Sequence, residues 1–301
     1  SGTRMYPHEE ERDGLHAEDI DGDGLILSMR VEDEGGGWKV SEKDARLLVP
    51  RRFDETAGTF YRVFPEGRIR NFDGVEVKEA PRKQGLDFNR NFPANWEPQS
   101  KQSGSGEYPF SESETRALAE FIIAHPNICG LHILHTGMES IIRPPATQTD
   151  KEMPDEDLRR SLEIGKLGVE LTDYVLFSYY KLNDEIYVAH GDFATWTYEH
   201  LGLLVFCDEL WDVRARSGKD YVELHEMNKE RDLEGLEEVE VAALQWNDEV
   251  LGGEGFVDWH AFEHPQLGAV EIGGWNRILR NNAPPQLLEE TCEKMARFLT
   301  A

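Results

Sequence analysis

An amide and a guanidinium stand next to each other at Asn89 and Arg90, within residues 85–93 (GLDFNRNFP). The segment follows polar sequence and is typical of a turn. Arginine can hold a carboxylate through two parallel N–H donors, and a neighbouring asparagine can supply a third donor. This pair therefore predicts a site that binds a carboxylate group.

Two short apolar runs end in side chains that can bind a metal or move a proton. Residues 130–135 (GLHILH) end at His135, and residues 203–209 (LLVFCDE) end at Glu209. Both runs predict buried strands, and sites in open α/β sheets gather at strand ends. Neutral imidazole is the commonest metal ligand, and a carboxylate beside a metal can act as a general base on bound water. Asp208 is the rival acid, but side chains alternate along a strand, so it would face the other side of the sheet.

Further candidate residues lie between and after these runs. Residues 178–187 (SYYKLNDEIY) predict a loop that ends in the phenol of Tyr187. Arg143 follows the first predicted strand, and it either lines a substrate groove or only pairs with an acid. Glu271, in a late apolar run, is a second rival for the role of Glu209.

The order Asn-Arg, His, Tyr and Glu resembles that of the zinc metallocarboxypeptidases of the carboxypeptidase A/B type. The resemblance is closest over residues 186–209, which match the family's Ile-Tyr, Gly, Trp-x-Tyr and Phe-x-x-Glu pattern without a gap between Tyr187 and Glu209. This spacing favours Glu209 over Glu271. The similar region covers about residues 83–211, and the flanking sequence resembles a bacterial subgroup of the family.

The resemblance implies a role for each candidate residue. Asn89 and Arg90 would bind the C-terminal carboxylate of a peptide substrate, and His135 would be one ligand of a single zinc ion. Tyr187 would close over the substrate and hydrogen-bond to it. Glu209 would activate the zinc-bound water and pass its proton to the leaving amine.

The resemblance also implies the specificity of the enzyme. It places the floor of the pocket for the substrate's terminal side chain at Ala194 and Thr195, neither of which is charged. A buried ammonium without a partner is costly, whereas burial of an apolar side chain is favourable. We therefore expect a preference for neutral or apolar C-terminal residues. Asp192, two positions earlier, would favour basic residues if its carboxylate reached the pocket.

The sequence departs from the family in its zinc ligands. The family supplies a His and a Glu, three residues apart, well ahead of the Asn-Arg pair. His8 and Glu11 have this spacing, but no apolar strand precedes them and residues 9–12 (EEER) are typical of a solvated charge run. A zinc site needs three protein ligands plus an open position. We therefore expect this chain to be an incomplete piece of a longer carboxypeptidase-like protein, one that by itself binds zinc poorly and has little activity.

Two other functions stay open. One is a non-catalytic protein on the same fold that binds peptide C-termini or other carboxylates through Asn89, Arg90 and Arg143. The other is an amide hydrolase on the same scaffold that acts on a non-peptide acyl substrate.

Residues 19–25 (DIDGDGL) carry acids at alternate positions. Asp19, Asp21 and Asp23, with the backbone carbonyl of Leu25, resemble the start of an EF-hand-type calcium loop. The closing glutamate of such a loop is absent, because Arg30 occupies its position, and Glu32 or Glu34 would have to replace it. The segment therefore predicts a structural calcium site, with an ordinary acidic turn as the alternative.

Composition limits the possible partners. The chain has 301 residues, with 59 acidic and 32 basic side chains and a formal net charge of -27. This charge argues against binding to nucleic acids or anionic membranes, and no apolar stretch approaches the length of a membrane span. The three cysteines show no disulfide spacing. The resemblance, not the composition, implies a peptide partner with a free C-terminus. The sequence leaves the location open and slightly favours an extracellular or periplasmic one.

The predicted elements that position the candidate residues are those of an α/β fold. We expect a mixed, mostly parallel sheet with helices on both faces, incomplete at its N-terminus. Residues 1–82 predict a polar insertion with hairpin strands and the candidate calcium loop, and residues 83–301 predict the α/β catalytic domain. Helices are predicted from capping boxes, Pro and Gly signals and periodicity at residues 111–123, 155–174, 193–201, 236–250 and 286–299.

Overall fold

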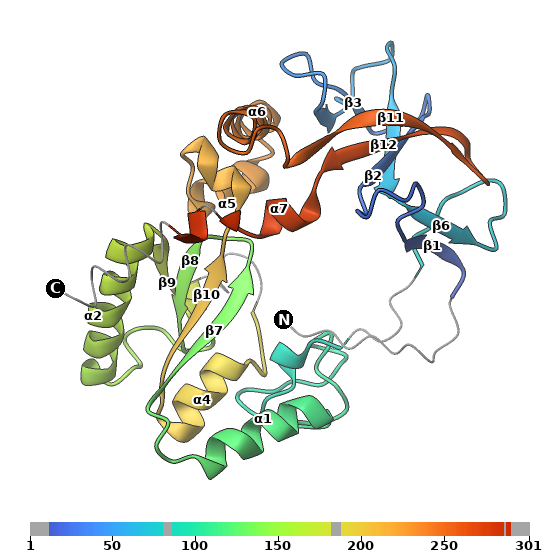
Figure 1. The fold of residues 1–301 in the computed structure, drawn as a ribbon. Coiled ribbons are helices and arrows are strands. Elements are labelled where there is room, and N and C mark those ends of the chain that lie inside the picture. Colours follow the sequence, from blue (N-terminus) through green and yellow to red (C-terminus); the bar gives the residue numbers. More distant parts are fainter. Residues whose placement is uncertain (1–11, 81–85, 182–187, 286, 290–301) are drawn as a thin grey trace. The chain divides into compact units, whose positions relative to one another are not determined.

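The chain forms two compact units in the computed structural model, which describes residues 12–80, 86–181, 188–285 and 287–289 (Figure 1). The first, called the mixed-sheet unit, consists of the described residues 86–181, 188–210, 285 and 287–289. The second, called the antiparallel unit, consists of residues 11–81 and 211–284. Each unit has its own sheet and its own core.

The mixed-sheet unit is built on four strands in the order β7-β10-β8-β9. They are β7 (Gly130–Thr136), β10 (Leu204–Leu210), β8 (Ser140–Arg143) and β9 (Val175–Ser178). β7 and β10 run parallel, β8 is antiparallel to β10, and β9 is parallel to β8. The predicted α/β class with a mixed sheet is confirmed.

Two helices cover the face of the sheet that carries His135. α1 (Ser113–Ala124) and α4 (Phe193–Leu201) supply most of a core cluster that includes Trp196. Leu131 of β7 packs against this cluster, and it lies on the same side of the strand as His135 because both are odd-numbered positions. This packing joins the helices to the strand that positions the imidazole.

The third helix, α2 (Asp155–Thr172), covers the opposite face. Gly165 leaves so little space over β9 that an added Cβ would lie 2.7 Å from the side chain of Leu176. The glycine therefore permits close contact between helix and sheet. The predicted arrangement of helices on both faces is confirmed, as is the start of α2 directly after Pro154.

Local sequence signals predicted both ends of α4 correctly but not the start of α1. α4 has the bounds expected from the sequence, because Asp192 caps its first turn and Gly202 ends it in the left-handed conformation at φ 67°. The predicted capping box at residues 111–114 is wrong. α1 begins at Ser113, and its N-cap Glu112 makes no side-chain cap bond.

The prediction that residues 130–135 form a buried strand is also wrong. β7 is an edge strand of the four-stranded sheet, and its residues alternate between exposed and half-buried. Leu134 is 65% exposed. His132 lies on this outer face and pairs with Asp208, with 2.6 Å between Nδ1 and Oδ2.

The antiparallel unit contains a six-stranded sheet with the order β11-β12-β2-β5-β3-β4, and a two-stranded sheet of β1 and β6. Its core cluster is formed by Leu27, Met29, Val270 and Ile272. The strands are β1 (Gly14–Ala17), β2 (Ser28–Glu32), β3 (Trp38–Val40), β4 (Leu48–Pro50), β5 (Tyr61–Pro65), β6 (Gly67–Arg70), β11 (Phe256–His264) and β12 (Gly268–Trp275). The helices are η2 (Val213–Ser217), α5 (Tyr221–Glu230), α6 (Leu233–Val250) and α7 (Arg277–Asn281). Within the described ranges, no helix is long and apolar enough to cross a membrane.

This division differs from the predicted boundary after residue 82. β12 pairs with β2 in antiparallel register, so that Ile272 lies opposite Met29, and both side chains are fully buried. Residues 211–284 therefore group with residues 11–81 instead of completing one domain from residue 83. The physical reason is that the apolar residues of β2 and β12 become buried together in one core cluster. The two strands lie far apart in the sequence, so neither one carries a local signal of this pairing.

Candidate functional site

His135 and Glu209 lie directly opposite each other at the ends of the parallel strands β7 and β10. Their Nδ1 and Oε1 atoms are 3.6 Å apart, and their side chains are 14% and 18% exposed. Both side chains lie on the face of the sheet that carries Cys207, and Cys207 belongs to a buried cluster with Tyr179. The two predicted chemical groups therefore meet on a largely desolvated surface.

Burial shifts the proton affinities of this pair in directions that suit catalysis. Desolvation lowers the pKa of His135 below its usual value, which favours the neutral imidazole that a metal requires. Desolvation also raises the pKa of Glu209 to about 7. A carboxyl group with this pKa can both accept and return a proton near neutral pH.

Asn89 and Arg90 form the end of a short 3-10 helix, η1 (Phe88–Arg90), at the start of the mixed-sheet unit. Asp87 caps this turn by accepting the Asn89 N–H at 2.9 Å. Arg90 is 7% exposed, and its Nη1 donates to the carbonyl of Asn89. After desolvation, nearby charges also act on the pKa of His135, with Asp87 raising it and Arg90 lowering it. The guanidinium is therefore within electrostatic reach of the His135 imidazole.

A glycine joins this turn to α4. Gly191 accepts the Phe92 N–H at 2.9 Å and donates its own N–H to Ala94 at 2.9 Å. Its φ is +72°, and an added Cβ would lie 2.4 Å from the carbonyl oxygen of Arg90. Only glycine fits both constraints. Asn89 strengthens the junction, because its Oδ1 accepts the N–H of Phe193, the first residue of α4.

Asn91 is a positioning residue that the sequence reasoning missed. Its side chain is completely buried and makes five hydrogen bonds. Nδ2 donates to the carbonyls of Ser105 and Tyr108 and to Oγ of Ser111, and Oδ1 accepts from the Glu112 N–H and from Oγ1 of Thr115. These bonds fix the turn that carries Arg90 to the segment that leads into α1. The signal was weak, because asparagine in a turn-rich segment is usually explained by the turn itself.

The predicted pocket floor lies in the first turn of α4. Ala194 and Thr195 are both buried, and Oγ1 of Thr195 accepts the N–H of Ala146 at 2.9 Å. Asp192 is also buried, and its Oδ1 accepts the Thr195 N–H at 2.7 Å. Desolvation raises the pKa of Asp192. Because it accepts the Thr195 N–H, the Asp192 carboxylate acts as the N-cap of α4. This role does not support the alternative in which Asp192 selects basic side chains.

Other candidate residues are placed differently or lie outside the described residues. Arg143 is buried at the end of β8 and forms an ion pair with Asp150. This contact favours the ion-pair interpretation over a role in binding substrate. Glu271 pairs with Arg30 in the antiparallel unit, whereas His135 belongs to the mixed-sheet unit.

The predictions for Tyr187 and for the pair His8 and Glu11 fall outside the described residues. Zinc needs three protein ligands. Among the described residues, no cluster of three potential metal ligands includes His135. His135 suits one ligand position, but the described side chains do not by themselves complete a zinc site.

The predicted calcium loop has a different set of carboxylates. Asp19 and Asp21 come together with the fully buried Glu66, whereas Asp23 is not part of the cluster. Oδ1 of Asp23 instead accepts the Leu25 N–H at 2.7 Å. The prediction that Asp23 and the Leu25 carbonyl join the site is therefore not supported. The carboxylates of Asp19 and Glu66 also accept hydrogen bonds from backbone N–H groups, as expected for an acid-rich turn.

Comparison with known proteins supports the resemblance noted in the sequence. A family model described as zinc carboxypeptidase matches residues 67–227, just over half of the chain. Mast cell carboxypeptidase A of Homo sapiens is 31% identical over 136 residues, which are 42% of this chain and 32% of that protein. Carboxypeptidase A1 of Mus musculus is 25% identical over 138 residues, which are 44% of this chain and 33% of that protein. The chain thus spans about a third of the length of the curated relatives it matches.

Among solved structures, the crystal structure of thrombin activatable fibrinolysis inhibitor is similar over 50% of this chain and 38% of that chain. The sequence identity is 24% and the TM-score is 0.37.

Asn91→Ala is expected to destabilise the chain by about 2–4 kcal/mol, because it leaves several buried partners without a hydrogen bond. Urea unfolding of the variant and the parent measures this loss. Asn127→Ala, at an exposed loop position, is the matched control and should stay within about 0.5 kcal/mol of the parent. Equal stabilities of the two variants would contradict the role given to Asn91.

Proposed function

The chain belongs to the zinc carboxypeptidase family, and from this premise we propose that its mixed-sheet unit carries the substrate-binding and proton-transfer residues of a metallocarboxypeptidase. The observation that carries the proposal is the placement of the half-buried Glu209 directly across from His135 at the ends of two parallel strands. Arg90, held by the adjoining turn, supplies the cation that a peptide C-terminus needs.

Arg90 would bind the C-terminal carboxylate of the substrate. Its planar guanidinium matches the two carboxylate oxygens, and burial strengthens this interaction because little water competes. The bonds of Gly191 and Asn91 hold the turn in one position. The scissile peptide bond, one residue from the carboxylate, would thereby be held at a fixed distance from Arg90.

Glu209 would act first as a base and then as an acid. It would take a proton from the water that attacks the scissile carbonyl, and then give this proton to the nitrogen of the leaving amine. A pKa of about 7 suits both steps near neutral pH. A zinc ion would polarise the carbonyl and lower the pKa of water, and it would need ligands in addition to His135.

Peptide hydrolysis by the whole protein is proposed here as well, because the chain covers only about a third of the length of its curated relatives. The incomplete ligand set among the described residues also favours a second candidate, a non-catalytic protein that binds peptide C-termini through Asn89 and Arg90. Both candidates predict binding, and only the first predicts hydrolysis.

Glu209→Gln is expected to lower kcat by several powers of ten in the full-length protein while leaving zinc content and peptide affinity nearly unchanged. The amide keeps the shape of the side chain, but it cannot accept the proton from water. Hydrolysis of a blocked dipeptide ending in Phe, with zinc measured by metal analysis, tests this outcome.

Asp208→Asn is the matched control, because Asp208 is the neighbouring acid and pairs with His132 on the other face of the sheet. It should keep kcat within about threefold of the parent, since it loses no group that reaches the substrate. Near-normal turnover of Glu209→Gln would refute the assignment. Peptide binding by the parent without any hydrolysis would favour the non-catalytic candidate.

The uncharged pocket floor leads to a prediction about specificity. Peptides ending in Phe or Leu should have a higher kcat/KM than matched peptides ending in Arg. An unpaired cation at Ala194 would cost several kcal/mol, whereas a large apolar side chain gains roughly 1.5–3 kcal/mol on burial. Ala194→Asp is the matched variant and should shift the preference towards Arg. A tenfold preference of the parent for Arg would refute this pocket assignment.

We further propose that Asp19, Asp21 and Glu66 hold one calcium ion that stabilises the loop of residues 19–25. A ligand that binds only the folded state stabilises it by about 2.7 kcal/mol at 100 times its Kd. Added calcium should therefore raise the Tm of the parent but not that of Asp21→Asn. An unchanged Tm of the parent would favour the ordinary acidic turn.

A further inference from the structure

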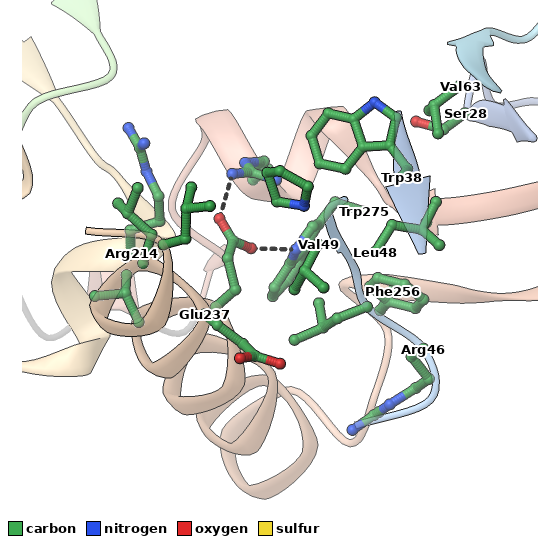
Figure 2. Close-up of a pocket in the computed structure, with 18 of the residues that line it drawn as sticks. Ser28, Trp38, Arg46, Leu48, Val49, Val63, Arg214, Glu237, Phe256 and Trp275 are labelled. Carbon is green, nitrogen blue, oxygen red and sulfur yellow. Dashed lines mark hydrogen bonds and ion pairs between the residues drawn. The ribbon is translucent and has the colours of Figure 1, made fainter. Parts of the chain in front are cut away.

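A cavity of about 760 Å³ lies inside the antiparallel unit, between one face of the six-stranded sheet and the helices α6 and α7 (Figure 2). All its lining residues belong to this unit. Pockets that bind small organic molecules have about this volume. No residue of the carboxypeptidase site described above takes part in it.

One wall of the cavity is aromatic. Trp38 of β3, Trp275 of β12, and Phe256 and Trp259 of β11 all line it. Figure 2 shows Trp38, Trp275 and Phe256 around the same space, with the apolar side chain of Leu48 among them. Such a wall favours a ligand with a flat, apolar body, because aromatic pairs gain energy beyond the area they bury.

The acids in the cavity are already paired. Glu240 accepts from Nε1 of Trp275 at 3.0 Å and from Nη2 of Arg280 at 2.9 Å. Glu237 accepts from the hydroxyl of Ser41. These pairs leave little acceptor capacity for a cationic ligand.

Three of the four arginines that line the cavity, in contrast, retain unused donors, whereas Arg46 is paired with Asp44 and Asp248 through each of its guanidinium nitrogens. A guanidinium carries five N–H groups. Arg214 uses Nε and Nη2 on Asp212, and Arg280 uses Nη2 on Glu240. Arg277, one turn before Arg280 on α7, makes no hydrogen bond or ion pair with any described residue. The free hydrogen-bonding capacity of the cavity is therefore cationic and donor-rich.

We propose that this cavity binds a small organic carboxylate with an aromatic body. The ring would lie against Trp38 and Trp275, and the carboxylate would accept hydrogen bonds from Arg277 and from the unused donors of Arg214 and Arg280. Planar guanidinium groups match a carboxylate in geometry as well as charge. The net charge of -27 acts mainly at long range, where salt screens it, so it does not prevent a monoanion from binding at contact distance.

The test uses 2-naphthoate as a probe and the 301-residue chain as the protein. Three of the seven tryptophans line the cavity, so occupancy should change the intrinsic fluorescence. We expect saturable binding of 2-naphthoate with one site per chain. The neutral 2-naphthamide should bind about tenfold more weakly, because it lacks the charge-assisted hydrogen bonds.

Arg277→Gln is the variant that tests the assignment, since no described ion pair is lost with it. It should weaken binding of 2-naphthoate about fivefold and leave binding of 2-naphthamide unchanged. Arg52→Gln is the matched control, because Arg52 is an exposed arginine of the same unit that does not line the cavity. It should bind both probes like the parent.

Three outcomes would overturn the proposal. The first is that a chain shown to be folded by circular dichroism does not bind 2-naphthoate saturably. The second is that the acid and the amide bind with equal affinity. The third is that the Arg277→Gln variant binds 2-naphthoate as well as the parent does. None of these measurements depends on peptide hydrolysis. The proposal can therefore fail or succeed separately from the proposed function.

Discussion

The parallel pairing of β7 with β10 is the constraint on which the candidate site depends. The hydrogen-bond ladder sets Glu209 opposite His135 and Asp208 opposite Leu134. A shift of one residue would turn every side chain of β10 to the other face, so that Asp208 would lie on the His135 side. The register thus decides which of two adjacent acids has access to the imidazole.

The same register decides the electrostatic environment of each acid. Glu209 lies on the face covered by buried side chains, and this desolvation raises its pKa. Asp208 lies on the opposite face and forms an ion pair with His132, whose side chain is largely exposed. Two neighbouring carboxyl groups of the same strand therefore have different histidine partners, because Glu209 faces His135 and Asp208 faces His132.

The carboxylate-binding turn depends on a second set of interactions, which are made by backbone and amide groups. Gly191 ties the turn to α4 through two backbone hydrogen bonds, and Asn91 ties it to the start of α1. α1 and α4 in turn pack against β7 through one core cluster. Arg90 is thereby held by the same helices that cover the His135 side of the sheet, although it lies far from His135 in the sequence.

The sequence by itself determined the features that depend on local chemistry. It gave the identity and order of Asn89, Arg90, His135 and Glu209, and it gave the bounds of α4, because a capping acid and a terminal glycine act within one helical turn. Only the tertiary structure decided that Asn91 is a buried positioning residue, that Arg143 is paired with Asp150, and that β7 is an edge strand. It also decided that residues 211–284 complete the sheet begun by residues 11–81, and that this sheet and its helices form an open pocket lined by arginine and tryptophan. Except for the pair Arg143 and Asp150, these features depend on contacts between segments that are separated in the chain. Neither segment alone carries a local signal of such a contact.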